Sequence, residues 1–530
     1  MRLVNLFRRL FDSSQGLSDR LIPRWLLLRA LAVWYLSAFY SLLFQIKGLI
    51  GPNGILPAGK YLAAVQHAFP GLARFWYAPS LFWISAGNPM LMAVTWLGLL
   101  AAVFAFLNLW PRISFLLCFI CFLSFVSTAN DFSGYQSDGM LLEAGFLAIF
   151  LAPPGALPGW GANHPPSRAS YFLLLWEWFR IYFESGLVKI FSGDPQWRNF
   201  TAMDDYYQNL PLPTWTGWYA GHFPHWFHVA STAGTLLLEY VVVLMLFLPR
   251  RARIVCFLIV TPWQLGVILS GNYAFLNYLV LSLAILLLDD PALRKFIPSG
   301  FKPLTNYHPP DVEHTTAFGG KPGRPFRIPR LAFAAIFLTW IAYATTAELA
   351  GFFIHPSQLA ELPVEALEPF RIANQYGLFA IMTHGRYEIE FQGSNDNQTW
   401  SPYPFQYKPQ SLNERPGIYA PYQPRFEWNL WFASLGDWDQ NQIVPLTEER
   451  LLANDADVLS LVRGNSFPQA PPRFVRAVLW QYWFTSIAQK RQTGNWWRRS
   501  LLGQYAPTLT RVDNGTVVAI QPADQLPTHD

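Results

Sequence analysis

The sequence predicts a polytopic α-helical membrane protein with about nine spans, followed by a C-terminal extracytoplasmic domain that resembles a β-sandwich. Three observations predict this fold class: the composition, the apolar runs that fill residues 25–350, and the change of composition after residue 350. Of the 530 residues, 52% are hydrophobic and 13% are charged, whereas about a quarter of the residues of a soluble protein are charged. Aromatic residues make up 17% of the chain, which is typical of a membrane protein with interfacial belts.

The transmembrane prediction depends on apolar runs, because a helix needs about 20 mostly apolar residues to cross a bilayer. The third, fourth and eighth runs are short, which is consistent with tilted, re-entrant or buried helices. The nine runs are 25–46, 89–110, 113–127, 140–152, 171–191, 229–248, 254–270, 273–288 and 331–350.

Lysine and arginine indicate the orientation, because cytoplasmic loops carry an excess of both. Basic residues precede the first run, which places this end of the chain in the cytoplasm. If there are nine spans, the cluster at Arg250 lies on the same side. So does the basic loop 294–330, which includes Lys302, Lys321 and Arg324. We therefore expect three parts. They are a basic cytoplasmic arm at 1–24, a transmembrane domain at 25–350 with an aromatic outer loop at 192–228, and an extracytoplasmic β-rich domain at 351–530.

The outer domain is predicted from its alternation of apolar and polar residues. Residues 386–392 alternate as a half-buried strand does, and turn-forming residues follow at 393–397. Residues 426–432 and 474–484 are also rich in strand formers. Residues 447–462 carry apolar side chains at a helical period, so we expect a sandwich with one helical insertion.

The sequence does not favour redox chemistry, metal binding, nucleic-acid binding or transport. Cys118 and Cys121 have the C-x-x-C spacing but lie in an apolar run, where two small packing residues are the better interpretation. Histidines at 222, 225 and 228 favour an interfacial turn over a metal site. No Lys/Arg block with interleaved aromatics indicates a nucleic-acid partner, and the spans do not form two related halves with broken helices, as in a transporter. We predict no metal and no cofactor.

Charged residues inside the apolar runs are the candidate functional residues, because a charge at membrane depth is costly. Glu177, Arg180 and Glu184 share one helical face, while Lys189 is turned about 140° from Glu184. Two interpretations stay open: a structural ion network, or a desolvated Lys189 that acts as a base in an outward-facing cavity. Lys189 is the candidate catalytic residue, and its expected partners are Glu143, Glu239, Asp138 and Asp194. The candidate polar cluster around it comprises Asp138, Glu143, Glu177, Arg180, Glu184, Asp194, Trp197, Glu239, Asn272 and Asn277.

Six segments resemble the lipase maturation factor family. They are SDGMLLEAGFL (137–147), GLVKIFSGDPQWR (186–198), GNYAFLNYL (271–279), NQYGLFAIMT (374–383), PRFEW (424–428) and PPRFVRA (471–477). The resemblance implies a membrane-embedded protein whose outer domain assists the folding of secreted clients, lipases in the animal members. No cysteine lies outside the predicted spans, and in this respect the chain resembles a bacterial member of the family. The expected location is the bacterial inner membrane with a periplasmic outer domain, or the endoplasmic reticulum membrane for a eukaryotic chain.

Two shorter resemblances point elsewhere. Residues 186–190, GLVKI, followed by Trp197, are similar to a segment of vitamin K-dependent carboxylase relatives, which implies that Lys189 is a base. The alternative function is therefore a membrane-embedded enzyme. Residues 387–396 are similar to the opening strands of discoidin-like jelly rolls, which implies a sandwich that binds a protein or glycan. The client and the oligomeric state are not predicted.

Overall fold

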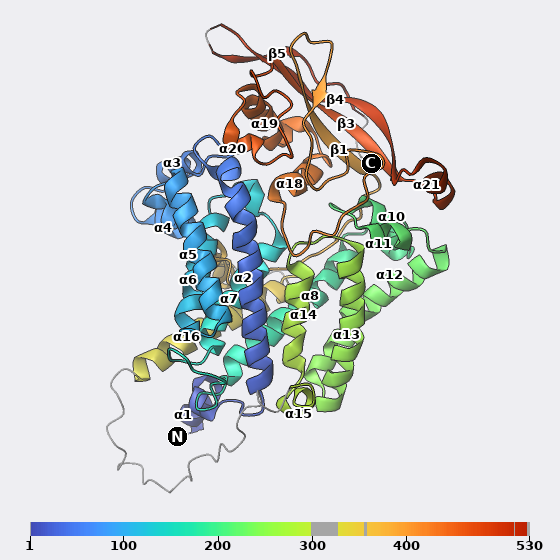
Figure 1. Cartoon of the computed structure of the whole chain (residues 1–530). Helices are drawn as coiled ribbons and strands as arrows, with labels where there is room; N and C mark the ends of the chain where they lie inside the picture. The colour runs from blue at the N-terminus through green and yellow to red at the C-terminus, as the bar shows by residue number, and fades with distance from the viewer. Residues whose placement is uncertain (1, 298–326, 355–357, 514, 527–530) are drawn as a thin grey trace.

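The computed structural model describes residues 2–297, 327–354, 358–513 and 515–526. A bundle of long helices forms one part of the molecule, and a smaller part with a β-sheet lies on one end of it (Figure 1). The basic residues Lys302, Lys321 and Arg324 of the predicted cytoplasmic loop lie outside the described residues.

Each of the nine predicted runs coincides largely with a helix of the bundle, although 89–110 extends past the end of its helix at Phe106 and 273–288 begins before its helix does at Leu276. Helix α12 continues into the tighter turn η4 (Val242–Phe247), and α14 continues into η5 (Ile285–Leu287). The nine helices are α2 (Leu21–Ile50), α5 (Asn88–Phe106), α6 (Pro111–Val126), α7 (Gln136–Leu151), α8 (Arg168–Phe191), α12 (His225–Tyr240), α13 (Arg250–Ser270), α14 (Leu276–Ala284) and α16 (Arg327–Ala350).

Five of these helices are long and apolar enough to cross a membrane: α2, α5, α12 with η4, α13 and α16. Helix α6 and the α14–η5 pair are shorter, α7 has 16 residues, and α8 carries five charged side chains. An integral membrane protein is thus confirmed, while the number of spans stays a prediction.

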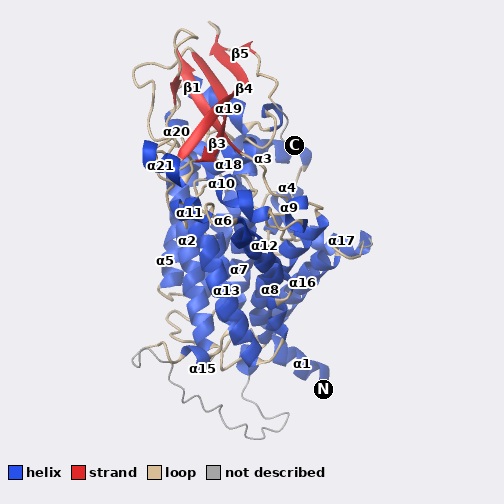
Figure 2. Cartoon of the chain, turned by 90° about the vertical axis from the view of Figure 1, so that its right-hand side faces the viewer, coloured by secondary structure: helices blue, strands red, loops and turns tan. Residues whose placement is uncertain are grey.

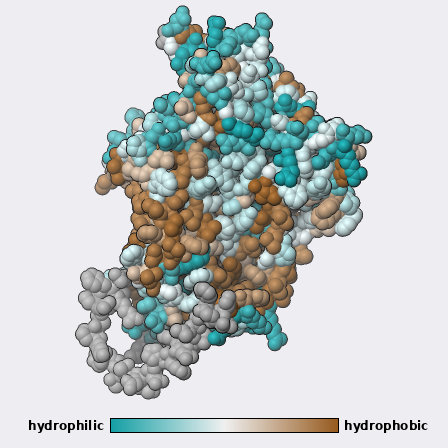
Figure 3. Space-filling model, viewed as in Figure 1, coloured by the Kyte–Doolittle hydropathy of each residue, from teal (hydrophilic) through white to brown (hydrophobic). Residues whose placement is uncertain are grey.

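On the face shown in Figure 3, apolar residues form a belt over the middle of the bundle, with hydrophilic residues above and below it. Large apolar side chains are exposed there, such as Leu100 on α5 and Leu258 on α13. Helix α1 (Arg2–Phe11) and helix α15 (Asp290–Leu293) both lie at the end far from the sheet (Figure 1). Arg250 forms an ion pair with Asp289 at this end; the cytoplasmic location of this end stays a prediction.

Short helices connect the long ones, mostly on the side of the sheet. The aromatic outer loop 192–228 folds into several of them before α12 begins (Figure 2). The connecting elements are η1 (Ser13–Gln15), α3 (Ala58–Ala68), α4 (Ala73–Tyr77), η2 (Leu81–Trp83), η3 (Asn130–Ser133), α9 (Pro195–Arg198), α10 (Ala202–Asn209), α11 (Trp215–Ala220), α17 (Gln358–Glu365) and η7 (Glu368–Phe370).

The outer domain contains one antiparallel sheet with the strand order β2-β1-β3-β4-β5. In its centre, Ile389 on β1 is opposite Leu479 on β3. The strands are β1 (Arg386–Ser394), β2 (Ser401–Pro402), β3 (Phe474–Phe484), β4 (Trp497–Arg511) and β5 (Val517–Gln521); the helices and turn are α18 (Arg425–Ala433), η8 (Trp438–Gln440), α19 (Ile443–Leu452), α20 (Ala456–Leu459) and α21 (Ile487–Thr493).

The sheet confirms the strands predicted at 386–392 and 474–484 but corrects the rest of the outer domain. Residues 426–432 form helix α18 rather than a strand, because Phe426, Leu430 and Ala433 recur at a helical period and are all buried. The predicted helix at 447–462 is divided into α19 and α20 at Asn454, which has a positive φ. Helices α18 and α19 pack against the sheet where a sandwich would place a second sheet, so among the described residues the sandwich is not found.

Candidate functional site

The predicted polar residues of the bundle lie on α7, α8, α9, α12 and the start of α14. Glu177, Arg180, Glu184 and Lys189 are all buried on α8, as are Asp138 and Glu143 on the neighbouring helix α7. A buried charge is stable only with hydrogen bonds and a charged partner. The partners of these residues therefore indicate their role.

Asp138 pairs with an arginine of the outer domain. Arg425, the first residue of α18, donates two parallel hydrogen bonds to the Asp138 carboxylate, of 2.7 and 2.8 Å, and both side chains have no exposed surface. The same guanidinium donates to the carbonyl of Phe132 and lies over the ring of Phe125. This fork geometry is the strongest form of an arginine–carboxylate pair.

Arg180 holds the segment that enters the outer domain. It pairs with Glu143, lies 3.8 Å from Glu184, and donates to the carbonyl of Asn374. Glu143 accepts hydrogen bonds from the Asn374 amide and from the Tyr376 hydroxyl, and Glu184 accepts one from the Tyr376 amide at 2.7 Å. Residues 371–383, which we call the threaded segment, thus run through the buried charges of the bundle.

Glu177 is the exception on α8. It is buried, but no described cation lies within ion-pair distance, and its carboxylate oxygens have no hydrogen-bond partner among the described residues. The predicted Glu-Arg-Glu network therefore forms with Glu143 in place of Glu177.

Lys189 pairs with Glu239, one of its four predicted partners, at 2.9 Å. Its ammonium also donates to the carbonyls of Ser185 and Leu378, at 3.2 and 2.9 Å. All three protons of a charged lysine are therefore directed at acceptors, which is the arrangement of a structural ion pair. The catalytic role of Lys189 stays a prediction.

Asp194 and Trp197 also hold the threaded segment. Asp194 caps α9 by accepting from the Gln196 amide at 2.8 Å, and it accepts from the Met382 amide at 2.7 Å. The indole of Trp197 donates to the carbonyl of Phe379 at 3.0 Å.

The two predicted asparagines differ in their contacts. Asn272 accepts from the amides of Tyr419 and Ala420, at 2.6 and 3.0 Å, and so binds a loop of the outer domain. Asn277 accepts from Gln264 on α13 at 2.9 Å, which is an ordinary contact between helices in a membrane.

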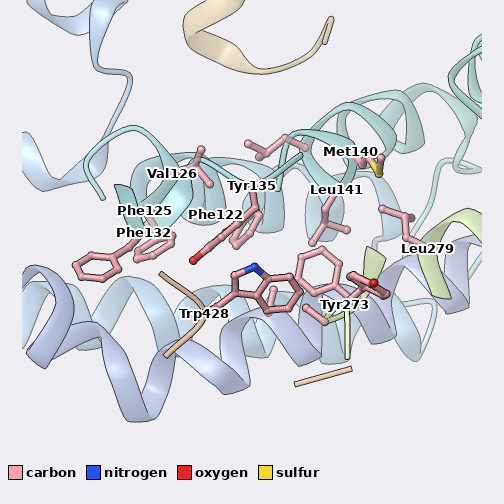
Figure 4. Packing of buried hydrophobic residues seen from close by; sticks show 14 of the residues in the cluster. Phe122, Phe125, Val126, Phe132, Tyr135, Met140, Leu141, Tyr273, Leu279 and Trp428 are labelled. Carbon is pink, nitrogen blue, oxygen red and sulfur yellow. The ribbon is translucent and has the colours of Figure 1, made fainter. Parts of the chain in front are cut away.

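Some residues that connect the outer domain to the bundle were not predicted from the sequence. Gln45, buried in α2, accepts from the Arg425 amide at 2.8 Å, and its place inside an apolar run is the signal that could have identified it. Trp428 of α18 lies among Tyr135, Tyr273 and other side chains of the bundle (Figure 4). The sequence gives no signal for Trp428, because aromatic residues are frequent throughout the chain.

A buried carboxylate on α18 holds a loop of the outer domain by hydrogen bonds. Glu427 accepts hydrogen bonds from three consecutive amides, those of Gln406, Tyr407 and Lys408, at 2.6 to 2.8 Å. Burial outweighs these bonds and raises the pKa of Glu427 to about 7.

The candidate residues do not converge on one cavity. Lys189, Glu239 and Asn277 line a cleft of about 600 Å³, whereas Asp138 and Glu143 are not among its lining residues. Within the described parts of the chain, no group of three or more metal-ligating side chains is found, and Cys118, Cys121 and Cys256 are buried free thiols. Most of the predicted polar residues thus fasten the outer domain to the bundle.

Comparisons with known proteins cover both parts of the chain. Residues 22–295 match the lipase maturation factor transmembrane domain, and residues 372–507 match the lipase maturation factor C-terminal domain. Lipase maturation factor 1 of Bos taurus is 33% identical over 512 residues, which cover 93% of this chain and 90% of that protein. Lipase maturation factor 1 of Homo sapiens is 31% identical, covering 92% of this chain and 88% of that protein.

A second type of relative is equally similar. Lipase maturation factor 2 of Gallus gallus is 31% identical over 585 residues, which cover 92% of this chain and 81% of that protein. No solved structure matches the chain. The matches extend over both the helical bundle and the sheet-bearing part, and the chain therefore belongs to the lipase maturation factor family.

Proposed function

We propose that this protein is a membrane-anchored maturation factor that assists the folding of secreted, lipase-like clients. The observation that supports it is the similarity to lipase maturation factors 1 and 2 along the full length of bundle and outer domain. The names of these relatives identify lipases as their clients, and we propose a lipase-like client for this chain on that basis.

The proposal includes the division of the chain and its location. Residues 1–24 form the cytoplasmic arm, 25–350 the transmembrane domain with the outer loop 192–228, and 351–530 the extracytoplasmic domain. The buried contacts of the threaded segment and of Arg425 support a modified boundary, since residues 371–383 pack as part of the bundle. We propose the bacterial inner membrane with a periplasmic outer domain; the lumen of the endoplasmic reticulum is the corresponding side in a eukaryote.

The client surface that we propose lies on the outer loop. Tyr219, Phe223 and Trp226 are 47%, 49% and 69% exposed on the same end of the bundle as the outer domain. Large rigid aromatic side chains supply contact area at low cost in conformational entropy, and they are enriched in protein interfaces.

The function is tested by co-expression with a secreted lipase in cells that lack family members. We expect the full chain to raise lipase activity per amount of secreted lipase antigen, and the double variant Phe223→Ser/Trp226→Ser to lose this effect at equal protein level. Leu258→Ser, an exposed apolar residue on α13 outside the outer loop, is the matched control. No rise in specific activity with the full chain, for any lipase of a panel, would contradict the proposed function.

A further inference from the structure

A cleft opens beside α8, between α12 and α13. Its volume is about 600 Å³, and its walls are largely apolar and aromatic, including Met203, Phe227 and Trp263. This volume lies within the range of small-molecule sites, about 300–1,000 Å³. The cleft is separate from the ion pairs of Asp138 and Glu143 that fasten the outer domain.

The cleft is lined by residues of the outer loop, such as Tyr206 and Ala220, and by residues within α12 and α13. Leu237 on α12 and Leu265 on α13 are 57% and 45% exposed beside it, as expected for side chains that face lipid. Figure 1 shows α12 leaning away from α13 toward the end that bears the sheet. The exposed apolar side chains on both helices indicate that lipid contacts this side of the bundle.

Two glycines leave the walls of the cleft unfilled. A Cβ atom added at Gly234 on α12 or at Gly266 on α13 would meet no other atom within 4 Å. Both glycines line the cleft. A larger side chain at either position therefore meets no described atom in its first 4 Å.

One polar atom at the inner end of the cleft has no partner. Glu239 pairs with Lys189 through Oε1, but its Oε2 has no hydrogen bond among the described residues, and the residue is only 4% exposed. Gln264 is already satisfied, since it donates to Asn277 and accepts from Tyr182. A buried carboxylate oxygen without a donor is unfavourable, so a ligand that donates a hydrogen bond to Oε2 would be stabilised.

We propose that this cleft binds a neutral single-chain lipid with a hydroxyl-bearing head group, of the monoacylglycerol type. The chain lies along Gly234 and Gly266, and a hydroxyl donates to Glu239. The Lys189–Glu239 pair carries no net charge, and all three Lys189 protons already have acceptors, so a neutral hydroxyl satisfies Oε2 without adding a charge to the cleft. The site is independent of the proposed maturation function.

The test uses the purified full chain in nanodiscs with a diazirine-bearing monopalmitoyl glycerol. We expect photolabelled peptides from α8, α12 and α13, and labelling about tenfold lower in Gly234→Leu, whose side chain fills the cleft. Gly266→Leu fills it from the opposite wall and should act alike. Ala233→Leu, on the exposed face of α12 and outside the cleft, should label as wild type does.

A second probe tests the head group. The methyl ester of the same photoreactive fatty acid lacks the hydroxyls, and we expect it to label the cleft about tenfold less, because it cannot donate to Glu239. Equal labelling by both probes would overturn the role of Glu239. Labelling spread evenly over α5 and α16, or unchanged in both leucine variants with wild-type melting temperatures, would overturn the site.

Discussion

At the scale of single residues, the ion pair between Asp138 and Arg425 joins the helical bundle to the outer domain. Both side chains are fully buried, so the loss of one partner leaves an uncompensated buried charge. Removing one partner of a buried pair typically costs about 3–5 kcal/mol, whereas removing both costs less. The geometry thus makes each residue depend on the other.

We predict that Arg425→Met lowers the stability of the detergent-solubilised protein by about 3–5 kcal/mol. The double variant Arg425→Met/Asp138→Asn should recover part of this loss, because no charge then stays unpaired. Thermal unfolding followed by tryptophan fluorescence measures both. Arg463→Met breaks the exposed pair with Glu414 and should cost about 1 kcal/mol or less; a loss equal to that of Arg425→Met would contradict the docking role.

Lys189→Met separates the two roles proposed for Lys189. As the partner of Glu239, Lys189 should contribute stability, and its loss should lower the melting temperature and the maturation activity together. The double variant Lys189→Met/Glu239→Gln should restore both in part. A protein with unchanged melting temperature and no activity would instead support a base.

At the scale of elements, the close approach of the threaded segment to α7 depends on a glycine. A Cβ atom at Gly139 would lie 2.9 Å from the Asn374 side-chain oxygen. We predict that Gly139→Ala destabilises the protein by about 1–3 kcal/mol and increases proteolysis at the threaded segment. Gly266→Ala, which meets open space within its helix, should leave melting and proteolysis unchanged or slightly improved; equal proteolysis in the two variants would contradict the prediction.

The loop held by Glu427 should respond to pH. Because the folded-state pKa of about 7 exceeds the ordinary value of 4.5, the folded state binds the proton more tightly than the unfolded state. Stability of this element is therefore greatest below about pH 4.5, falls as the pH rises toward 7, and is constant above. Hydrogen exchange of the Gln406–Lys408 amides, corrected for intrinsic rates, should show this dependence.

The Glu427→Gln variant provides the control for the pH dependence. A glutamine does not titrate, so the corrected exchange should become independent of pH in this range. Glu414→Gln changes an exposed carboxylate on the same side of the domain and should keep the wild-type dependence. The same pH dependence in Glu427→Gln would show that another group is responsible.

The sequence predicts the bundle better than the outer domain, for physical reasons. Apolar runs are local and continuous, so all nine predicted helices are found. Strand β4 is not predicted, because Gly503 and Pro507 interrupt its pattern, and α18 resembles a strand because its aromatic residues are also strand formers. The partner of Asp138 could not be predicted, since Arg425 lies 287 residues away in the chain.

At the scale of the whole molecule, the sheet and the basic cluster lie at opposite ends of the apolar belt (Figures 1 and 3). We predict that Gln492→Cys on the outer domain reacts with a membrane-impermeant maleimide in intact cells. Arg251→Cys should react only after lysis. The native cysteines are buried and give little background. The reverse pattern would invert the topology.

The threaded segment also constrains the order in which the protein can be completed. Helices α7 and α8, which carry Glu143, Arg180 and Glu184, are synthesised early. Asn374 and Tyr376 follow much later, since Tyr376 lies 192 residues after Glu184 in the chain. During that interval Glu143 and Glu184 have Arg180 as a partner but lack the hydrogen bonds from Asn374 and Tyr376. The hydrogen bonds that complete this buried charge cluster therefore form only after residues 371–383 have been synthesised.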